Sequence, residues 1–524
     1  MILPRDLLRR AGAALADQPA FIDGGRRRSW GDMDRRADRL AAALQGLGVG
    51  KGDVCAVLAH DRVEVIEQWF ACLKLGALRV GINWRYAPRE MLHLLHDSSA
   101  RVLLVEASCV PLLAGELDAL RRAGLILIGF GAGHDLPLDY ETLLAAADRP
   151  ATLPALGEDD LVAISYTTGT TGLPKGALWT QRGVRDALVY SSLMLGLRQS
   201  DIYFAPFPMA GVPLLCGSLG LVNGMTVLLP DGDFEAARAL ELLAEHRATT
   251  GIFVPTMLQR VLEQHAAGHH DLSALRMVSY GSSPATPQLI RTAMSQLGCE
   301  LIQLYGLTEA TAGWLSFLQH EDHLRALDGR PELLTSCGRP ALHVDLSIRS
   351  EQGEALGPDE VGEIWVQGTV NTPGYLNRPD ENAELFSGDW LRTHDLGRLD
   401  ADGYLYLTDR KKFLIITGGY NVYPVTVEAV LAEHPAVREV AVVGAPHPEW
   451  GEAVVATVSL KDGAQATVDE LLDFCRPRLA KYEVPKHIEI VADLPKGLTG
   501  KILKKNIQGW YKDDPARLPW KSVD

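Results

Sequence analysis

Short apolar runs alternate with amphipathic segments along the first 150 residues. The apolar runs predict strands at residues 54–58, 77–82, 102–105 and 125–130. Val63, Ile66, Phe70 and Leu73 recur at helical spacing, and residues 88–96 predict a second helix. Strands that alternate with helices in this way favour a parallel sheet with crossover helices.

A second alternating run begins near residue 160. Its predicted strands are residues 161–165, 227–230, 251–254, 277–280 and 301–304, with a helix at residues 235–246. Residues 204–213 hold three prolines and two aromatic side chains, which predicts a stiff, irregular segment. We therefore expect a second α/β sheet in this part of the chain.

From residue 340 the pattern changes to short strands of the antiparallel kind, with a turn signal at Asp402-Gly403. The strands predicted there are residues 344–348, 363–366 and 404–407. Small elements follow: strands at 413–417, 437–443, 454–460 and 488–491, and helices at 425–433 and 468–479. The prediction is an α/β protein with a large N-terminal domain, residues 1–410, and a small α+β cap, residues 411–524. The large domain would contain two α/β sheet subdomains and a small antiparallel β region.

The composition is that of an ordinary globular protein, with 47% hydrophobic and 22% charged residues. A formal net charge of -15 argues against nucleic acid as a partner, so phosphates would be bound by local groups. The seven cysteines are odd in number and never spaced Cys-x-x-Cys, which favours reduced thiols and a cytoplasmic location. We expect no signal peptide and no integral membrane segment, because no uncharged apolar run has the required length.

The stretch from Tyr166 to Gly176, Tyr-Thr-Thr-Gly-Thr-Thr-Gly-Leu-Pro-Lys-Gly, follows the strand predicted at 161–165. Its glycines allow the backbone to approach a ligand, and successive N–H groups in such a turn form an anion site. Four threonine hydroxyls and the charge of Lys175 add further donors. The spacing does not match a Walker A loop, which ends in Gly-Lys-Ser/Thr. We interpret the stretch as a polyphosphate-binding loop rather than an ordinary surface turn.

Two further polar loops follow predicted strands: Gly281-Ser282-Ser283 and Tyr305-Gly306-Leu307-Thr308-Glu309. In doubly wound sheets, ligands bind at the carboxyl ends of the strands, so these loops and the phosphate loop are expected to converge. A flat apolar ring such as that of Tyr305 suits a purine, and the Glu309 carboxylate suits Mg²⁺ shared with phosphates.

These motifs, in this order, resemble those of the adenylate-forming superfamily, which includes acyl-CoA synthetases, luciferases and peptide-synthetase adenylation domains. The acyl-CoA synthetase branch is the most similar, and the resemblance covers essentially the whole chain. It implies a nucleotide site formed by Thr167, Thr168, Gly169, Thr170, Thr171, Gly172, Lys175, Gly281, Ser282, Ser283, Tyr305, Gly306, Asp395 and Arg410. Thr308 and Glu309 would act in catalysis, with Glu309 as the Mg²⁺ ligand and Tyr305 stacked on adenine.

The segment from Trp390 to Gly397 is similar to the family motif Thr-Gly-Asp, whose aspartate accepts hydrogen bonds from both ribose hydroxyls. Asp395 would take that role. His394 stands where the family has glycine, which puts the local backbone geometry in question. Arg410 matches the family arginine that also approaches the ribose.

The resemblance implies that the C-terminal cap is mobile and swings about a hinge at Lys412. Gly418-Gly419 resembles the backbone that lines the pantetheine tunnel of acyl-CoA synthetases, where two glycines permit close approach. Lys501, in the segment Leu494-Pro-Lys-Gly-Leu-Thr-Gly-Lys501, matches the catalytic lysine of the family's C-terminal motif. The cap would exchange Lys501 for the CoA tunnel between two half-reactions.

The resemblance also implies a substrate pocket formed by Phe207, Met209, Gly211, Leu307 and Gly313. Met209 stands where the family often has histidine. A flexible thioether there indicates a more apolar or adaptable acyl pocket, with neutral drift as the alternative.

The resulting hypothesis is an ATP-dependent carboxylic acid–CoA ligase that forms an acyl-AMP intermediate on a fatty or other hydrophobic acid. Its cofactors and cosubstrates would be ATP, Mg²⁺ and coenzyme A. One alternative passes the acyl group to an amine or a carrier-protein thiol, and another is a catalytically silent nucleotide-binding regulator. The identity of the acid and the oligomeric state stay open, with a homodimer as one option.

Overall fold

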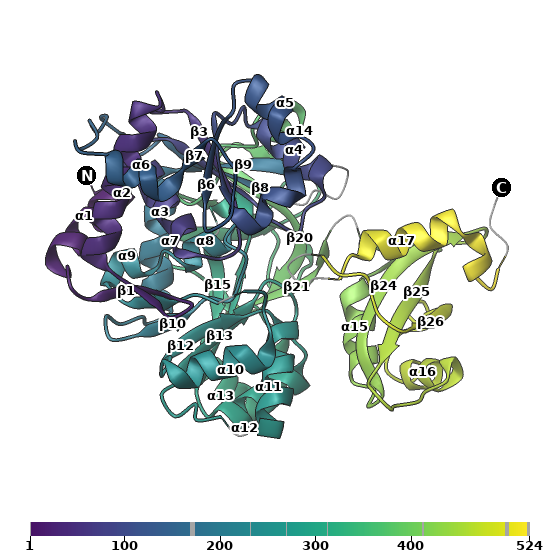
Figure 1. Cartoon of the computed structure of the whole chain (residues 1–524). Helices are drawn as coiled ribbons and strands as arrows, with labels where there is room; N and C mark the ends of the chain where they lie inside the picture. The colour runs from purple at the N-terminus through teal and green to yellow at the C-terminus, as the bar shows by residue number, and fades with distance from the viewer. Residues whose placement is uncertain are drawn as a thin grey trace.

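The computed structural model describes residues 2–167, 173–230, 232–268, 270–311, 313–410, 413–497 and 502–520. Within these ranges the strands form four sheets, three in the larger N-terminal part and one in the C-terminal part (Figure 1). Two of the sheets have parallel cores and one is antiparallel, and the C-terminal part folds around its own sheet. This architecture confirms the predicted fold class.

The first sheet has the strand order β7-β6-β5-β3-β4-β8-β9, and within it β9 alone runs antiparallel to its neighbour. Its strands are β3 (Val54–Leu58), β4 (Leu78–Ile82), β5 (Val102–Glu106), β6 (Ile126–Phe130), β7 (Leu138–Asp139), β8 (Leu161–Thr167) and β9 (Lys175–Thr180). The helices of this region are α1 (Pro4–Ala14), α2 (Trp30–Gly46), α3 (Val63–Leu75), α4 (Pro88–Asp97), α5 (Leu117–Arg122) and α6 (Tyr140–Ala146), with the 3₁₀ helix η1 (Ala107–Leu113). Strands β3, β4 and β5 are buried at every position, because both faces of a parallel sheet are covered.

The second sheet has the order β16-β15-β14-β13-β12-β10-β11-β1-β2. Its strands are β1 (Pro19–Asp23), β2 (Arg26–Ser29), β10 (Ile202–Phe204), β11 (Thr226–Leu228), β12 (Thr250–Phe253), β13 (Met277–Gly281), β14 (Glu300–Gly306), β15 (Trp314–Leu318) and β16 (Arg339–Pro340). Its helical segments are α7 (Gln181–Met194), α8 (Pro213–Cys216), α9 (Gly220–Asn223), α10 (Ala236–Glu245), α11 (Pro255–Gly268), α12 (Pro287–Leu297), η2 (Thr308–Ala310), α13 (His320–Leu327) and η3 (Pro331–Thr335). Helices α10, α11 and α12 pack on one face of this sheet (Figure 1).

The N-terminal hairpin β1–β2 belongs to the second sheet, although the first sheet follows it directly in the chain. β1 pairs in parallel with β11, so that Phe21 lies opposite Val227. The sequence pattern did not predict this pairing, because strand periodicity carries no information about a partner so far along the chain. A single apolar cluster contains side chains of both sheets and of α3, which is buried along its whole length.

The third sheet is antiparallel throughout, as predicted, with the order β17-β18-β20-β19 and β21 paired to β20. Its elements are β17 (Val344–Arg349), β18 (Gly362–Gly368), β19 (Phe386–Ser387), β20 (Trp390–Leu399), β21 (Leu405–Arg410) and the helix α14 (Pro379–Leu385). The sequence analysis did not predict β20, because Arg392, His394 and Asp395 interrupt its apolar positions.

The C-terminal sheet has the order β23-β22-β25-β24, with β26 paired to β25. Its elements are β22 (Ile415–Thr417), β23 (Tyr420–Val422), α15 (Pro424–Ala432), β24 (Val437–His447), β25 (Gly451–Leu460), α16 (Val468–Cys475), β26 (His487–Val491), α17 (Lys504–Asp513) and η5 (Pro515–Arg517). Helices α15 and α16 pack in one apolar cluster and α17 in a second one. α16 ends at Cys475 rather than at residue 479, since Pro477 has no backbone N–H to continue the helical hydrogen bonds. α17 was not predicted.

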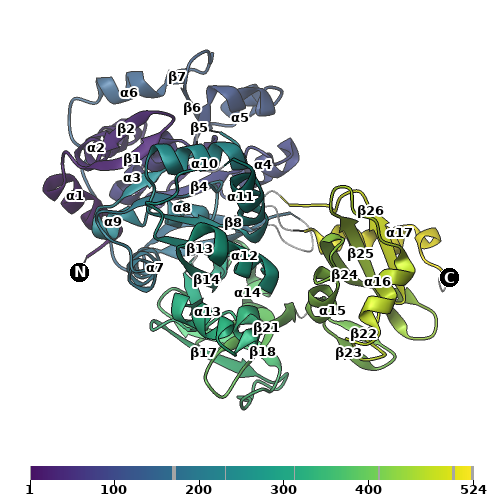
Figure 2. The ribbon, with the colours of Figure 1, turned by 90° about the horizontal axis from the view of Figure 1, so that it is seen from below.

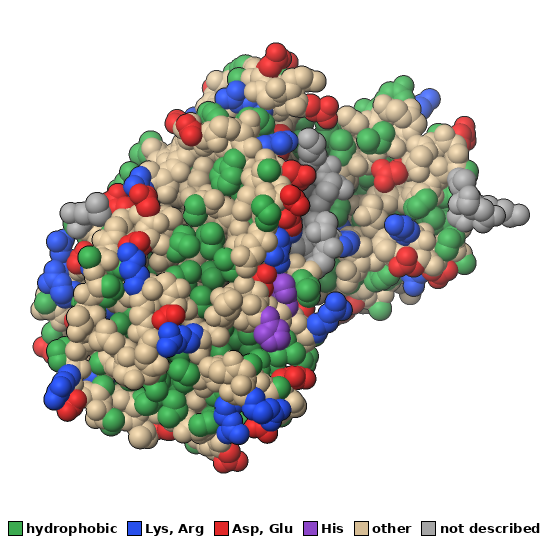
Figure 3. Space-filling model, turned by 90° about the horizontal axis from the view of Figure 1, so that it is seen from above, with side chains coloured by type: hydrophobic (Ala, Val, Ile, Leu, Met, Phe, Trp, Pro, Cys, Tyr) green, Lys and Arg blue, Asp and Glu red, His purple; other side chains and the backbone are tan. Residues whose placement is uncertain are grey.

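Figures 1 and 2 show the C-terminal part beside the N-terminal part. The predicted domain boundary after residue 410 falls next to residues 411 and 412, which lie outside the described ranges, so it remains a prediction. On the face drawn in Figure 3, basic and acidic side chains are interspersed. All seven cysteines are buried and free of disulfide bonds. None of the helices in the described ranges is both long and apolar enough to cross a membrane.

Candidate active site

The antiparallel strands β8 and β9 hold the two ends of the predicted phosphate loop. Thr167 and Lys175 are cross-strand partners, and the Thr167 hydroxyl donates to the Lys175 carbonyl at 3.4 Å. This pairing places Lys175 at the carboxyl end of β8, the edge at which α/β sheets bind ligands. The predicted residues between them, Thr168, Gly169, Thr170, Thr171 and Gly172, lie outside the described ranges.

Lys175 and Glu309 meet around the ring of Tyr375. Lys175 Nζ lies 5.6 Å from the ring centroid and 3.2 Å from Glu381 Oε1 on α14. The Tyr375 hydroxyl donates to Glu309 Oε1 at 2.5 Å. Two residues that are far apart in the sequence are therefore linked through one aromatic side chain, which no local sequence signal indicated.

The backbone around Glu309 is held from two sides. The indole N–H of Trp179 on β9 donates to the Thr308 carbonyl at 3.0 Å. The backbone N–H of Thr372 donates to the Glu309 carbonyl at 2.7 Å. Glu309 thus has a fixed backbone within η2, directly after β14, while its carboxylate remains half-buried.

This donor set fits a magnesium–phosphate group. Mg²⁺ prefers hard oxygen ligands such as the carboxylate of Glu309 and is usually shared with substrate phosphates. The ammonium of Lys175 supplies the positive charge that phosphates require, and its present partner, Glu381, is itself an anion. The sequence analysis predicted Glu309 as the metal ligand, and Glu309 lies within the described ranges.

Tyr305 and Asp395 also meet, although they come from different sheets. The Tyr305 hydroxyl donates to Asp395 Oδ2 at 2.8 Å, and both side chains are buried. Burial and the neighbouring Asp395 carboxylate raise the pKa of Tyr305 well above its ordinary value. The hydroxyl therefore keeps its proton and donates a hydrogen bond to the carboxylate.

His394 adopts the backbone conformation that the family's glycine would adopt without strain. Its φ is +58°, in the left-handed region that non-glycine residues rarely occupy. His394 Nδ1 lies 3.2 Å from Glu363 Oε1. Burial acts to raise the pKa of Glu363, but the hydrogen bonds from His394 and Arg392 outweigh it and hold that pKa at about 2. Asp395 contacts Tyr305 even though the residue before it is His394 and not the glycine usual in the family.

Arg410 is the cross-strand partner of Asp395 in the β20–β21 ladder. Its backbone thus lies next to the predicted ribose site, while its side chain is outside the description. The Thr393 hydroxyl accepts from the Asp395 N–H at 3.1 Å and donates to the Ile364 carbonyl at 2.7 Å. This chain of bonds fixes Asp395 against β18.

Gly281, Ser282 and Ser283 lie at the carboxyl end of β13, beside the end of β14. Gly281 pairs with Leu304, and a Cβ added to Gly281 would clash with the Leu304 carbonyl. Ser282 has a φ of +69°, and its side chain is exposed. A Cβ on Gly306, at the end of β14, would in turn clash with the backbone of Gly313. These two predicted loops therefore emerge from adjacent strands, while the phosphate loop follows β8 of the first sheet, and the convergence of all three remains a prediction.

The predicted acid-pocket residues share one apolar region. Phe207 and Met209 are buried in the cluster between the two sheets, and Leu307 packs against the same cluster. A Cβ added to Gly211 would lie 3.6 Å from the Ser165 hydroxyl, and one on Gly313 would lie 2.9 Å from the Ala310 carbonyl. A side chain fits beside Ser165 at Gly211, whereas at Gly313 it would collide with the backbone of Ala310 and with Val370.

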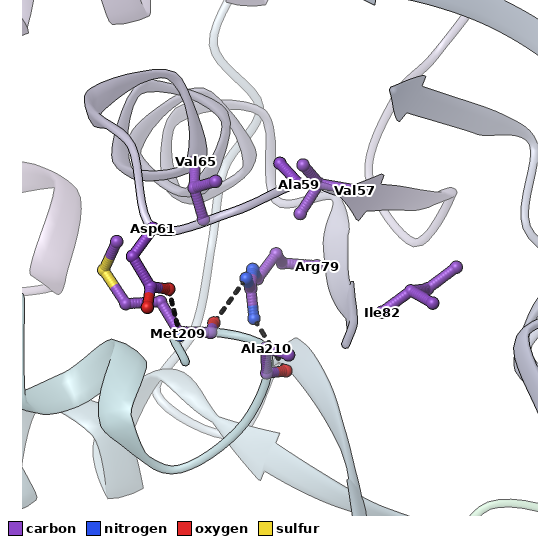
Figure 4. Close-up of a pocket in the computed structure, with 8 residues that line it drawn as sticks. All are labelled: Val57, Ala59, Asp61, Val65, Arg79, Ile82, Met209 and Ala210. Carbon is purple, nitrogen blue, oxygen red and sulfur yellow. Dashed lines mark hydrogen bonds between the residues drawn. The ribbon is translucent and has the colours of Figure 1, made fainter. Parts of the chain in front are cut away.

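Two buried charged residues that the sequence analysis missed hold the Met209 segment (Figure 4). Asp61 accepts from the Met209 N–H at 2.7 Å. Arg79 donates to the Met209 carbonyl at 2.7 Å and to the Ala210 carbonyl at 3.2 Å. Burial raises the pKa of Asp61 to about 7 and lowers that of Arg79 to about 10. An arginine inside an apolar strand was the available sequence signal.

The predicted cap residues are only partly described. Gly418 and Gly419 form the exposed turn between β22 and β23, with φ values of +56° and +84°. A Cβ on Gly419 would meet no atom within 4 Å. The predicted hinge Lys412 and the predicted catalytic Lys501 both lie outside the described ranges.

Comparison with known proteins identifies two family models, AMP-binding enzyme over residues 8–376 and AMP-binding enzyme C-terminal domain over residues 426–501. The chain is 32% identical to the fatty acid–[acyl-carrier-protein] ligase ScoC of Streptomyces coeruleorubidus, covering 95% of this chain and 94% of that protein. It is 33% identical to the long-chain-fatty-acid–CoA ligase FadD13 of Mycobacterium tuberculosis, covering 93% of each. The solved amide bond synthetase McbA of Marinactinospora thermotolerans is 31% identical, with a TM-score of 0.87 and coverage of 97% and 100%.

The names of these relatives state different products: a fatty acid joined to a carrier protein, a long-chain fatty acid joined to CoA, and an amide bond. The family models together span most of the chain, on both sides of the predicted boundary. The chain belongs to the AMP-binding, adenylate-forming enzyme family and is an adenylate-forming ligase that takes ATP and a carboxylic acid as substrates.

Proposed function

We propose that this ligase joins a fatty or other hydrophobic carboxylic acid to coenzyme A through an acyl-AMP intermediate. The observation that carries the proposal is the Lys175–Tyr375–Glu309 contact, which places a cation and a hard carboxylate together beside the phosphate-loop hairpin. That arrangement suits a nucleoside triphosphate with its metal ion.

In the first half-reaction, a carboxylate oxygen of the acid attacks the α-phosphorus of ATP, and the bond to the bridging oxygen breaks to release pyrophosphate. The protein's main task is to spread the negative charge that develops on the phosphates. Lys175 and the phosphate loop would bind the phosphates, and Lys501 would contact the reacting phosphate in this step. Bound at Glu309, Mg²⁺ would neutralise phosphate charge.

The Tyr305–Asp395 pair supports the nucleoside part of the proposal. Asp395 already accepts a hydroxyl hydrogen bond from Tyr305, which is the interaction that ribose hydroxyls would make with it. The ring of Tyr305 would lie against adenine, and Arg410 would approach the ribose from the neighbouring strand. Gly281, Ser282, Ser283 and Gly306 would border the nucleotide at the ends of β13 and β14.

The acid pocket is proposed to be apolar. Phe207, Met209 and Leu307 belong to or border one hydrophobic cluster, and Gly211 adds no side chain near Ser165. Met209 is held by Asp61 and Arg79 through its backbone, and its side chain lies in the apolar cluster. An apolar lining favours an alkyl or aryl chain over a polar acid.

In the second half-reaction, the CoA sulfur would attack the acyl carbon of acyl-AMP and release AMP. The exposed Gly418-Gly419 turn supports CoA as the acceptor, because its backbone has no side chain to exclude a thin pantetheine arm. Lys412 would serve as the hinge that exchanges Lys501 for this turn. The second candidate acceptor is an amine or a carrier-protein thiol, which the similarity to McbA and ScoC favours.

One assay separates these acceptors. Pyrophosphate release is measured with a panel of fatty and aryl acids, and the products are then identified by mass spectrometry after adding CoA, an amine or a carrier protein. We expect acyl-CoA to form with at least one hydrophobic acid. Pyrophosphate release that yields only amide or acyl-carrier protein would overturn the CoA proposal, and no release with any acid would overturn the substrate class.

A further inference from the structure

A second cluster of chemically active side chains lies at the carboxyl ends of β3 and β5, away from the adenylation site. His60 follows β3, Glu106 ends β5, and Cys109 lies in η1. β3 and β5 are adjacent parallel strands, with Leu58 opposite Val105. The adenylation residue Lys175 instead begins β9, at the edge of the same sheet, with β4 and β8 between.

The position of the cluster is a recognised place for ligands. After β3 the chain adds β4 on one side of it and then crosses to add β5 on the other side. The strand order is thus reversed between β3 and β5, and doubly wound sheets bind ligands in the crevice at such a switch point. The phosphate loop does not use this crevice, since it connects β8 and β9.

Three potential ligand atoms converge there. His60 Nδ1 lies 3.0 Å from Glu106 Oε2 and 3.8 Å from Cys109 Sγ. All three ligand atoms lie within 4.8 Å of one another, and within the described ranges this is the one such group of three. Ligands of a tetrahedral zinc ion are separated by about 3.3 Å for nitrogen and oxygen and about 3.6 Å for nitrogen and sulfur.

We propose that His60 Nδ1, Glu106 Oε2 and Cys109 Sγ bind one zinc ion. The fourth position is open to water, with the Ser108 hydroxyl close by at 3.5 Å from His60 Nδ1. The ligand set selects the metal, because a thiolate and an imidazole suit zinc, whereas Mg²⁺ and Ca²⁺ require oxygen ligands. The zinc joins the loops that follow two neighbouring strands.

The surroundings of the ligands hold them in position. The Arg62 guanidinium donates to Glu106 Oε1 at 3.0 Å, and the His60 backbone N–H donates to Glu106 Oε2 at 2.9 Å. The Trp84 ring packs against the His60 imidazole, with the ring centroids 4.7 Å apart. In protein zinc sites, residues that hydrogen-bond to the metal ligands in this way orient those ligands. Arg62 also pairs with Glu64 at 3.4 Å, which offsets its positive charge beside the metal.

The same residues do not form a nucleophilic triad. In a triad, the carboxylate and the nucleophile contact opposite nitrogens of the imidazole. Here Glu106 and Cys109 both contact Nδ1 of His60. Convergence on a single nitrogen is the arrangement expected around a shared cation, and its alternative is a plain His60–Glu106 ion pair.

The test uses the full chain produced without a polyhistidine tag. Zinc is removed with a chelator and titrated back in competition with a chromophoric indicator. We expect one zinc per chain, and we expect Cys109→Ser and His60→Gln each to weaken binding by at least about 10-fold, the effect reported even for outer-shell partners. Cys475→Ser, a buried cysteine in the C-terminal part, is the matched control and should bind as the parent does.

A measurement on the unaltered protein keeps the test independent of folding in the variants. Cobalt(II) added to the metal-free protein should produce a thiolate-to-metal charge-transfer absorption, which zinc then displaces. Cobalt binding without that absorption, or zinc affinity equal in the parent and in a folded Cys109→Ser variant, would overturn the site. A parent protein that binds no zinc at all would leave His60 and Glu106 as an ordinary ion pair.

Discussion

Lys175, Glu309 and Glu381 meet around Tyr375, and each side chain affects what the others can bind. Glu381 lies where a phosphate would be attracted, since it is the anion that Lys175 now contacts at 3.2 Å. An incoming triphosphate would have to compete with that carboxylate for Lys175. The Tyr375 hydroxyl donates a hydrogen bond to one carboxylate oxygen of Glu309, and this bond orients the carboxylate before any metal binds.

Glu309 should determine the magnesium requirement. Glu309→Gln keeps the shape and an acceptor for the Tyr375 hydroxyl but removes the charge that Mg²⁺ needs. We expect pyrophosphate release to fall on the order of 10²-fold and half-maximal activity to need several-fold more Mg²⁺. Activity is measured across a Mg²⁺ titration, with the exposed Glu354→Gln as control. An unchanged titration in Glu309→Gln would show that other groups hold the metal.

Lys501 should matter for one half-reaction only. Lys501→Ala removes a charged donor to the adenylation transition state, so acyl-AMP formation should slow by about 10²–10³-fold. Thioester formation from preformed acyl-AMP should fall much less. Rapid-quench measurement of each half-reaction checks this, with the exposed Lys505→Ala on α17 as control. Equal losses in both half-reactions would contradict the role.

At the scale of elements, side chains from β4 and from just after the end of β3 hold the irregular segment that contains Met209 in position. Asp61 follows β3 and Arg79 lies within β4, and the two side chains bond the segment through its backbone. Gly81 on β4 is required there, because a Cβ would clash with the Ala210 carbonyl. The first sheet therefore positions one wall of the proposed acid pocket, although that wall belongs in sequence to the second sheet.

Asp61 should make stability depend on pH. Burial raises its pKa to about 7 from 3.8, so the folded chain retains a proton that the unfolded chain releases between those values. The stability contributed by this proton is present below about pH 4 and is lost as pH rises through 7. Asp61→Asn, which can still accept from Met209, should remove up to about 4 kcal/mol of this dependence.

Urea unfolding of the parent and of Asp61→Asn, measured from pH 4 to pH 8, checks this expectation. The exposed Asp345→Asn is the control and should keep the parental slope. Parallel stability curves for the parent and Asp61→Asn would mean that Asp61 is ionised throughout this range.

At the scale of the whole molecule, the nucleotide residues and the Gly418-Gly419 turn belong to different parts of the chain. Lys175 and Tyr305 lie in the N-terminal sheets and Glu309 in η2 after β14, while the turn is exposed and connects two strands of the C-terminal sheet. The proposed two-step reaction requires Lys501 and this turn to reach the same acyl-AMP in succession. Rotation of the C-terminal part would allow this, because both residues are carried by it.

Gly419 should therefore matter for thioester formation alone. Gly419→Leu adds a side chain where a pantetheine arm is proposed to pass, and the Cβ meets no atom in the present arrangement. We expect first-turnover pyrophosphate release near the parental rate and acyl-CoA formation reduced by at least about 10-fold, as blocking an acceptor path would do without altering the adenylation barrier.

Gly463→Leu is the matched control for backbone strain. Gly463 also has positive φ, +74°, and open space around its Cβ position, but it lies outside the proposed tunnel. Both variants should lose comparable thermal stability. If Gly419→Leu makes acyl-CoA at the same rate as Gly463→Leu, the tunnel assignment is wrong, and with it the main reason to prefer CoA over an amine.

The sequence alone determined the elements whose periodicity is local and the positions of the motifs. Apolar runs such as those of β3, β4 and β5 are long enough to be recognised because a parallel strand is buried on both faces. The phosphate loop and the Tyr305–Glu309 segment were found because their chemistry lies in consecutive residues. α17 was missed although it is a local element, and β20 was missed because Arg392, His394 and Asp395 interrupt its apolar positions.

Only the tertiary structure decided which distant residues meet. Tyr375 joins Lys175 to Glu309, and β1 pairs with β11, through contacts that no periodicity encodes. Asp61 was unremarkable in the sequence because a charge after a strand is usually solvated, and burial against Met209 changes its chemistry. His60 and Cys109 meet because β3 and β5 are neighbours in the sheet, and strand order is set by packing across the whole domain rather than by either segment.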